Sequence, residues 1–219
     1  GPKRLQIAAY GAELVPIPGP RSEASLAAEQ SAASGAAYAS HAYLPYNLAG
    51  YATAAFETFE QLDAAPGAVI VPAGQGGLLL GISRGMQALR HAGQIDNVPV
   101  LVGVQAAACA PLAAYLDIGV PGLGFITEGQ TVAEGVRVRS PLRIQAVVNA
   151  VRESGGQVVA VDEAEILPGR DSLARLGFYV EPTSALVWAA LGRLLPTLPD
   201  PVVVMLTGSG YKSKPDWEQ

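Results

Sequence analysis

Cysteine and histidine are scarce in this chain of 219 residues. Cys109 is the single cysteine, which excludes an internal disulfide and a metal site built from cysteines. The only histidines, His41 and His91, lie in different predicted elements without ligand spacing, so we expect no metal site. Because a lone cysteine among small residues, as in AAACAPL, is typical of packing in a reducing compartment, we expect a cytoplasmic protein.

Long apolar runs and basic clusters are missing as well. No apolar run approaches the ~20 residues that a membrane helix needs, and the amino terminus lacks the apolar core of a signal peptide. Only 15% of the residues are charged, the net charge is −5, and basic residues cluster only at Lys3–Arg4 and Lys212–Lys214. Since nothing offers a nucleic-acid backbone a continuous cationic track, we expect neither nucleic acid nor a membrane as partner.

Alanine, glycine and branched apolar residues are abundant, and half of the chain is hydrophobic. From about residue 46 onward, short apolar runs alternate with segments of helical periodicity. The predicted strands lie at 67–74, 98–105, 157–163 and 200–210, and the predicted helices at 48–62, 78–93, 111–119, 140–156, 164–177 and 184–198. This alternation predicts a three-layer αβα fold with a mostly parallel sheet covered by helices on both faces.

The first 45 residues show the same alternation on a smaller scale. Helices are predicted at 2–11 and 21–35, and each is followed by a short apolar stretch, at 12–19 and 36–44, that reads as a strand. These two helix–strand units predict a partial second, small α/β domain.

Two loops concentrate glycine where a predicted strand ends: GQGGL at 74–78 and TGSGYK at 207–212. In an open α/β sheet, ligands bind beyond the carboxyl ends of the strands. Glycines there let backbone N–H groups and the start of the next helix face an anion, so the loops indicate a phosphate site. GQGGL matches neither GxGxxG nor the P-loop, and a tight strand-to-helix turn without a ligand explains one such loop equally well.

Four segments, taken in order, resemble the fold-type II pyridoxal-phosphate (PLP) enzymes, the group that contains threonine synthase, threonine dehydratase and the cysteine synthases. They are VPAGQGGLLLG (71–81), TVAEGVRVRSPLR (131–143), VEPTSALVWAAL (180–191) and VVVMLTGSGYK (202–212). The first 19 residues resemble the small domain of the same family, so the resemblance runs from end to end and is closest to threonine synthase. It implies that residues 1–45 are a remnant of the small domain and 46–219 the large PLP-binding domain.

The resemblance assigns site residues by position. It implies that the cofactor phosphate binds to the backbone N–H groups of Gly74, Gln75, Gly76, Gly77 and Leu78. Gln75 departs from the all-glycine form, which weakens the assignment only if its position demands a positive φ. Thr207, or Ser209 in the same turn, is expected against the pyridine nitrogen, where a neutral hydroxyl favours elimination or replacement over transamination.

Five acidic residues are given structural roles. Glu134 and Glu181 lie near the cofactor in such enzymes, but we expect each to cap a helix or to accept backbone N–H bonds. The cluster Asp162, Glu163 and Glu165 is interpreted as a solvated helix start.

The chain has only three lysines, Lys3, Lys212 and Lys214, and none matches the Schiff-base lysine of the family. The resemblance implies that this lysine lies upstream, so we expect no catalytic residue in this chain and no activity of the chain alone. We expect apolar faces left open to be covered by a missing amino-terminal segment or by a homodimer.

The function expected from the resemblance is that of the carboxyl-terminal region of a PLP-dependent lyase of amino acids. A threonine synthase-like enzyme acts by β- or γ-elimination or replacement and converts O-phosphohomoserine to threonine. Three alternatives stay open: a threonine/serine dehydratase-like enzyme, a non-catalytic PLP-fold binding or regulatory module, and an unrelated doubly wound protein that binds a phosphate-bearing metabolite.

Overall fold

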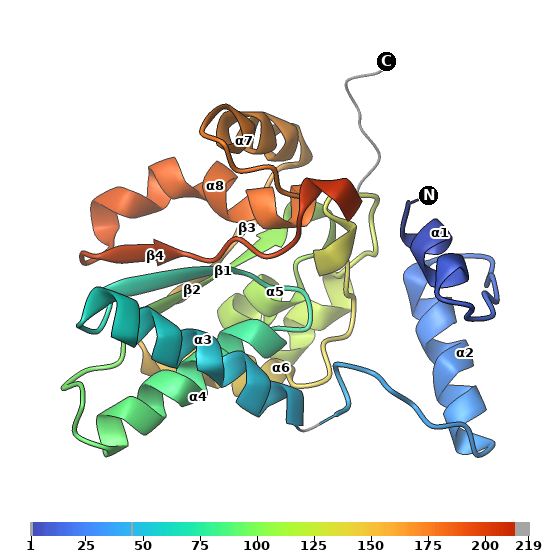
Figure 1. The fold of residues 1–219 in the computed structure, drawn as a ribbon, viewed down its shortest axis with the longest axis horizontal. Coiled ribbons are helices and arrows are strands. Elements are labelled where there is room, and N and C mark those ends of the chain that lie inside the picture. Colours follow the sequence, from blue (N-terminus) through green and yellow to red (C-terminus); the bar gives the residue numbers. More distant parts are fainter. Residues whose placement is uncertain (1, 45, 213–219) are drawn as a thin grey trace.

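The computed structural model describes residues 2–44 and 46–212, and a four-stranded parallel sheet forms its centre (Figure 1). The strands are β1 Ala68–Pro72, β2 Val100–Ala106, β3 Gln157–Val161 and β4 Val202–Val204. Their order across the sheet is β3-β2-β1-β4, and each neighbouring pair is parallel. The four strands predicted after residue 45 and their parallel arrangement are therefore confirmed.

Helices cover both faces of this sheet. They are α3 Tyr46–Leu62, α4 Gly77–His91, α5 Pro111–Ile118, α6 Ile144–Glu153, α7 Glu163–Arg175 and α8 Pro182–Leu194. Helices α3 to α6 lie on one face, whereas α8 lies on the other with α7 packed against it (Figure 1). Short 3₁₀ turns complete the fold: η1 Ala107–Cys109, η2 Val120–Phe125, η3 Glu134–Val136, η4 Leu195–Thr197 and η5 Gly210–Lys212. The predicted three-layer αβα architecture is confirmed.

Strand β1 is buried on both faces because each face of the sheet carries a hydrophobic core, and successive side chains of β1 point into one core and then the other. Val69 and Val71 belong to the core that α3, α4 and α6 form with the sheet, whereas Ile70 belongs to the core formed with α8. Every residue of β1 is buried. A strand covered on both faces has a continuous apolar run in its sequence, as in AVIVP.

Helices α3 and α4 approach each other closely through two glycines of α4. A Cβ atom on Gly81 would lie 2.3 Å from Cβ of Tyr51, and one on Gly85 would lie 2.6 Å from Cβ of Ala55. Both distances are far shorter than a carbon–carbon contact, so the two helices can pack this closely only because glycine occupies both positions. This packing holds α4, which begins at Gly77 after the loop that follows β1, against α3.

The amino-terminal segment lies beside the sheet and contains helices α1 Pro2–Ala9 and α2 Arg21–Ala33 (blue in Figure 1). Helix α2 has no buried residue, and large apolar side chains of the segment are open to solvent, with Leu5 73% and Tyr10 77% exposed. The strands predicted at 12–19 and 36–44 are not formed, and this part of the prediction was wrong. A strand needs a neighbour for its backbone hydrogen bonds, and no described segment pairs with either stretch.

No helix within residues 2–44 and 46–212 combines the length and apolar character that a membrane span requires. The division of the chain into a small-domain remnant, residues 1–45, and a large domain, residues 46–219, stays a prediction. Residue 45 itself and Lys214 lie outside the described residues.

Candidate functional site

The two predicted glycine loops lie at the same edge of the sheet. Strands β1 and β4 are parallel neighbours, with Ile70 paired with Val204, and the N–H of Met205 donates to the carbonyl of Ile70 at 2.9 Å. The carboxyl ends of both strands therefore meet. This topology brings the loop at 74–78 and the turn at 207–209 together although they are far apart in the sequence.

The conformation of the first loop requires its glycines. Gly76 has φ +74°, in the left-handed region, and a Cβ atom there would lie 2.6 Å from Cγ2 of the buried Val147. A Cβ atom on Gly74 would lie 2.9 Å from the carbonyl oxygen of Gly135. Gln75 does not have a positive φ, so a non-glycine residue fits at this position of the loop without backbone strain.

Backbone N–H groups in this loop have no hydrogen-bond partner among the residues that the structure describes. Residues 74–79 donate no backbone hydrogen bond to any described residue, and the first bond of α4 runs from the N–H of Leu80 to the carbonyl of Gly76. Within this stretch Gly74, Gly76 and Leu79 are buried. Because buried backbone donors are nearly always paired, a run of free donors at a helix amino terminus is a site for an anion.

The side chain of Gln75 supports the loop from outside. Its Oε1 accepts a hydrogen bond from the N–H of Leu142 at 2.9 Å, which ties the loop to the segment before α6. The Gln75 side chain thus has a structural partner of its own, while its N–H group is among the free donors.

The turn after β4 presents a free hydroxyl. The backbone N–H of Thr207 donates to Oγ of the buried Ser184 in α8 at 2.8 Å, which fixes the backbone, while the Thr207 hydroxyl bonds to no described residue. Ser209 forms an antiparallel bridge with Val180, and its Oγ accepts the N–H of Tyr211 at 3.4 Å. Of the two predicted hydroxyl residues, Thr207 is thus the one whose hydroxyl has no partner within residues 2–44 and 46–212.

The two glutamates predicted as caps behave differently from that expectation. Glu181 stands at the amino terminus of α8, but its side chain makes no capping bond; its Oε2 lies 3.6 Å from Nζ of Lys3. A Cβ atom on Gly208 would lie 2.0 Å from Oε1 of Glu181, so the carboxylate packs directly on the glycine-rich turn. Glu134 is exposed, and its carboxylate bonds to no described residue; its carbonyl oxygen accepts Nη1 of Arg21 at 3.0 Å and the N–H of Arg137 at 3.2 Å.

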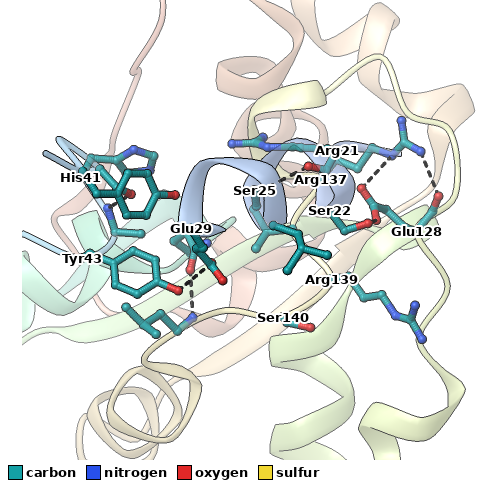
Figure 2. Close-up of a pocket in the computed structure, with 17 residues that line it drawn as sticks. Arg21, Ser22, Ser25, Glu29, His41, Tyr43, Glu128, Arg137, Arg139 and Ser140 are labelled. Atoms are coloured by element: carbon teal, nitrogen blue, oxygen red, sulfur yellow. Dashed lines mark hydrogen bonds and ion pairs between the residues drawn. The ribbon is translucent and has the colours of Figure 1, made fainter. Parts of the chain in front are cut away.

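A cavity of about 420 Å³ adjoins the first loop and lies between α2 and residues 128–142 (Figure 2). Gln75 lines it on the side of the loop, and the rest of the lining mixes apolar and polar residues with charged ones such as Glu128 and Arg137. Ser22 Oγ donates to Oε2 of Glu128 at 2.8 Å, and Arg137 approaches the same carboxylate with Nε at 3.9 Å from Oε1. Ser22 and Glu128 belong to none of the motifs found in the sequence, because they come together only in the folded chain.

His41 and Tyr43 also line this cavity. The hydroxyl of Tyr43 donates to Oε1 of Glu29 at 2.7 Å, and this hydrogen bond to a carboxylate raises the pKa of Tyr43. The carbonyl of His41 accepts a bond from Nδ2 of Asn47 at 3.0 Å. Among the described residues, no three His, Cys, Asp or Glu side chains are grouped as metal ligands.

A second hollow, of about 560 Å³, lies at the opposite edge of the sheet, where the strands begin. Asp63, Asp96 and Asn97 line it together with prolines. Ligands of parallel α/β sheets bind at the carboxyl ends of the strands, so the cavity beside Gln75 is the better candidate in spite of its smaller volume.

Gln105 is a buried polar residue that the sequence-based predictions missed. Its side chain bonds to the backbone at Ala73, directly before the glycine loop, and to the start of α5. The available signal was one amide in the otherwise apolar strand VLVGVQA.

Cys109 is buried as predicted, and burial together with the nearby Glu128 raises the pKa of its thiol. A raised pKa keeps the thiol protonated at neutral pH, and only the thiolate is reactive. We expect the native chain to react with a disulfide reagent at least about tenfold more slowly than the urea-unfolded chain. Equal rates for the two forms, followed by absorbance, would contradict this description of Cys109.

A family model described as pyridoxal-phosphate dependent enzyme matches residues 1–208. The chain belongs to this family. The motifs at 71–81 and 202–212 resemble segments of enzymes that use pyridoxal phosphate. The family match therefore confirms the resemblance, and with it the cofactor, at the level of the family.

Threonine synthases and a threonine deaminase are among the similar proteins. The threonine synthase of Methanosarcina acetivorans is 31% identical over 195 residues, which is 88% of this chain and 48% of that protein. The one of Methanocaldococcus jannaschii is 31% identical over 216 residues, 96% of this chain and 53% of that protein. A solved threonine deaminase of T.th. has 28% identity and a TM-score of 0.62, covering 78% of this chain and 61% of that one. The chain spans about half the length of both threonine synthases.

Proposed function

We propose that this chain is the carboxyl-terminal, cofactor-holding part of a pyridoxal-phosphate dependent lyase of the threonine synthase type. The proposed reaction is β- or γ-elimination or replacement on an amino acid, with the conversion of O-phosphohomoserine to threonine as the first candidate. The observation that carries the proposal is the run of free backbone N–H groups at residues 74–79, at the amino terminus of α4. Membership of the family identifies PLP as the anion to test there.

In this proposal, each part of the sheet edge has one task. The N–H groups of Gly74, Gln75, Gly76, Gly77 and Leu78 bind the cofactor phosphate, and the positive end of the α4 dipole adds to the attraction. The hydroxyl of Thr207 bonds to the pyridine nitrogen, and Ser209 is the second candidate for this contact. When bound, the cofactor withdraws electrons from the substrate carbon, and a neutral hydroxyl partner moderates this withdrawal.

The steric demands of the loop fix its backbone. Side chains are excluded at Gly74 by the carbonyl of Gly135 and at Gly76 by Val147, so the conformation of the loop depends on glycine at both positions. A phosphate bound by backbone groups makes no demand on the side chain of Gln75, which is bonded to Leu142.

The test compares the natural gene product with this 219-residue chain by intact mass, with and without borohydride reduction, in the presence of PLP. We expect a reducible adduct on the natural product and none on this chain, since none of its lysines matches the Schiff-base lysine. If neither sample takes an adduct, the lyase proposal fails and a non-catalytic PLP-fold module takes its place.

A threonine/serine dehydratase-like activity is the second candidate, favoured by the 28% identity with the T.th. threonine deaminase. The products distinguish the two candidate activities. A threonine synthase releases phosphate from O-phosphohomoserine, whereas a dehydratase releases ammonia from threonine or serine. Each product is measured separately with the same preparation of the natural gene product.

We further propose a cytoplasmic setting, and a surface that is covered by a missing amino-terminal segment or in a homodimer. A single, buried cysteine suits a reducing compartment. The exposed Leu5, Tyr10 and Val15 suit coverage by an amino-terminal segment or by a second copy of the chain, and neither nucleic acid nor a membrane is a proposed partner.

A further inference from the structure

Gln105 is fully buried near the end of β2, and both ends of its amide are occupied. Its Nε2 donates to the carbonyl oxygen of Ala73 at 2.9 Å. Its Oε1 accepts the N–H groups of Leu112 at 2.9 Å and Ala113 at 3.2 Å. With an exposed fraction of 0%, this side chain joins the end of β1 to the start of α5.

We propose that Gln105 is a positioning residue for the phosphate-binding loop. The inference rests on the proposed function of that loop and assigns a role to a residue outside it. The peptide between Ala73 and Gly74 is planar and trans, so its C=O and N–H point in opposite directions. Because Gln105 holds the C=O of Ala73, it turns the N–H of Gly74, the first free donor of the loop, away from Gln105.

The adjoining contacts leave this peptide group little freedom. The N–H of Ala73 donates to the carbonyl of Val104 at 2.8 Å, so the chain is fixed on the amino-terminal side as well. A rotation that swung the N–H of Gly74 out of the loop would break the bond between Ala73 and Nε2 of Gln105. A buried amide that loses its partner is costly, and this cost keeps the donor oriented before a ligand arrives.

Glutamine suits this position because one neutral side chain supplies a donor and an acceptor. The first N–H groups of a helix have no partners within the helix, and Oε1 of Gln105 satisfies two of them in α5. A carboxylate supplies the acceptor only, and a thioether of the same length supplies neither a donor nor a strong acceptor. Substitutions by glutamate and methionine therefore separate the two contacts.

The test measures binding of pyridoxine 5′-phosphate and of inorganic phosphate to the full chain by titration calorimetry, near neutral pH. Gln105→Met should weaken both affinities about tenfold, since the effect acts on the phosphate contacts. Gln105→Glu should weaken them similarly where its carboxyl is ionised, because it then keeps only the acceptor for α5. Burial raises the pKa of such a carboxyl, and the protonated form can still donate to Ala73, so both titrations are repeated at alkaline pH. Ser154→Ala is the matched control, because Oγ of Ser154 accepts the N–H of Leu101 at the other end of β2.

The readouts separate positioning from simple stabilisation. Loss of thermal stability in all three variants, with weaker phosphate binding only in the two Gln105 variants, is the expected pattern. Unchanged affinity in folded Gln105→Met overturns the positioning role and leaves the proposed function intact. If the wild-type chain binds pyridoxine 5′-phosphate no better than pyridoxine, the loop is no phosphate site and both proposals fail.

Discussion

Replacing Gly76 with alanine should abolish measurable phosphate binding and lower the free energy of unfolding by about 2–5 kcal/mol. An L-residue at φ +74° adopts the left-handed conformation at a cost of about 1–2 kcal/mol. The new Cβ atom would also lie 2.6 Å from Cγ2 of Val147, a buried and stiff side chain, which adds about 1–3 kcal/mol of overpacking. Relief of either strain moves the N–H groups of the loop. Urea denaturation and titration with pyridoxine 5′-phosphate measure the two effects.

Gly93→Ala supplies the control for the backbone contribution. Gly93 has φ +68°, close to the value at Gly76, but a Cβ atom there meets nothing within 4 Å. This variant should lose about 1 kcal/mol and keep its affinity for phosphate. Equal losses of stability and affinity in the two variants would show that the contact with Val147 and the place of Gly76 in the loop are irrelevant.

Replacing Gly85 with alanine should lower the free energy of unfolding by about 1–3 kcal/mol, although alanine is the better helix former. The added Cβ atom would lie 2.6 Å from Cβ of Ala55 and 2.7 Å from the carbonyl oxygen of Ala52. A backbone oxygen cannot move aside alone, so α3 and α4 must separate. Thermal and urea unfolding of the variant measure the loss.

The same substitution should have the opposite sign in α8. A Cβ atom on Gly192 meets nothing within 4 Å, and the residue is exposed. Gly192→Ala should therefore stabilise the chain by about 0.5–1 kcal/mol through helix propensity alone. If both alanine variants changed stability in the same direction, close packing of α3 on α4 would not be the reason for Gly85.

The sheet was predictable because its two central strands, β1 and β2, are buried on both faces. Runs such as AVIVP and VLVGV carry this information locally, and the glycine-rich loops mark their carboxyl ends. The stretches at 12–19 and 36–44 have a similar apolar character but form no strands. A strand depends on a distant partner, and local composition does not reveal whether the described chain supplies one.

In the candidate site, too, the residues set by local sequence were predicted and those set by remote contacts were not. The loop at 74–78 was found from its sequence because its function depends on glycine at neighbouring positions. Gln105 and Arg21 were missed because their partners are remote: Ala73 is 32 residues from Gln105, and Glu134 is 113 residues from Arg21. Such contacts are set by the topology of the sheet and by the position of α2, which no local pattern contains.

The attachment of α2 makes the first part of the chain a separate unit of stability. Helix α2 buries no residue, and exposed polar contacts, such as Ser22 with Glu128 and Arg21 with the carbonyl of Glu134, hold it beside the cavity. Contacts of this kind contribute about 0–1 kcal/mol each, so the segment opens at a far lower free energy than the sheet unfolds. A ligand that touches both walls of the cavity adds its own binding free energy to that of opening. Occupancy of the cavity and the order of the amino-terminal segment are then one coupled equilibrium.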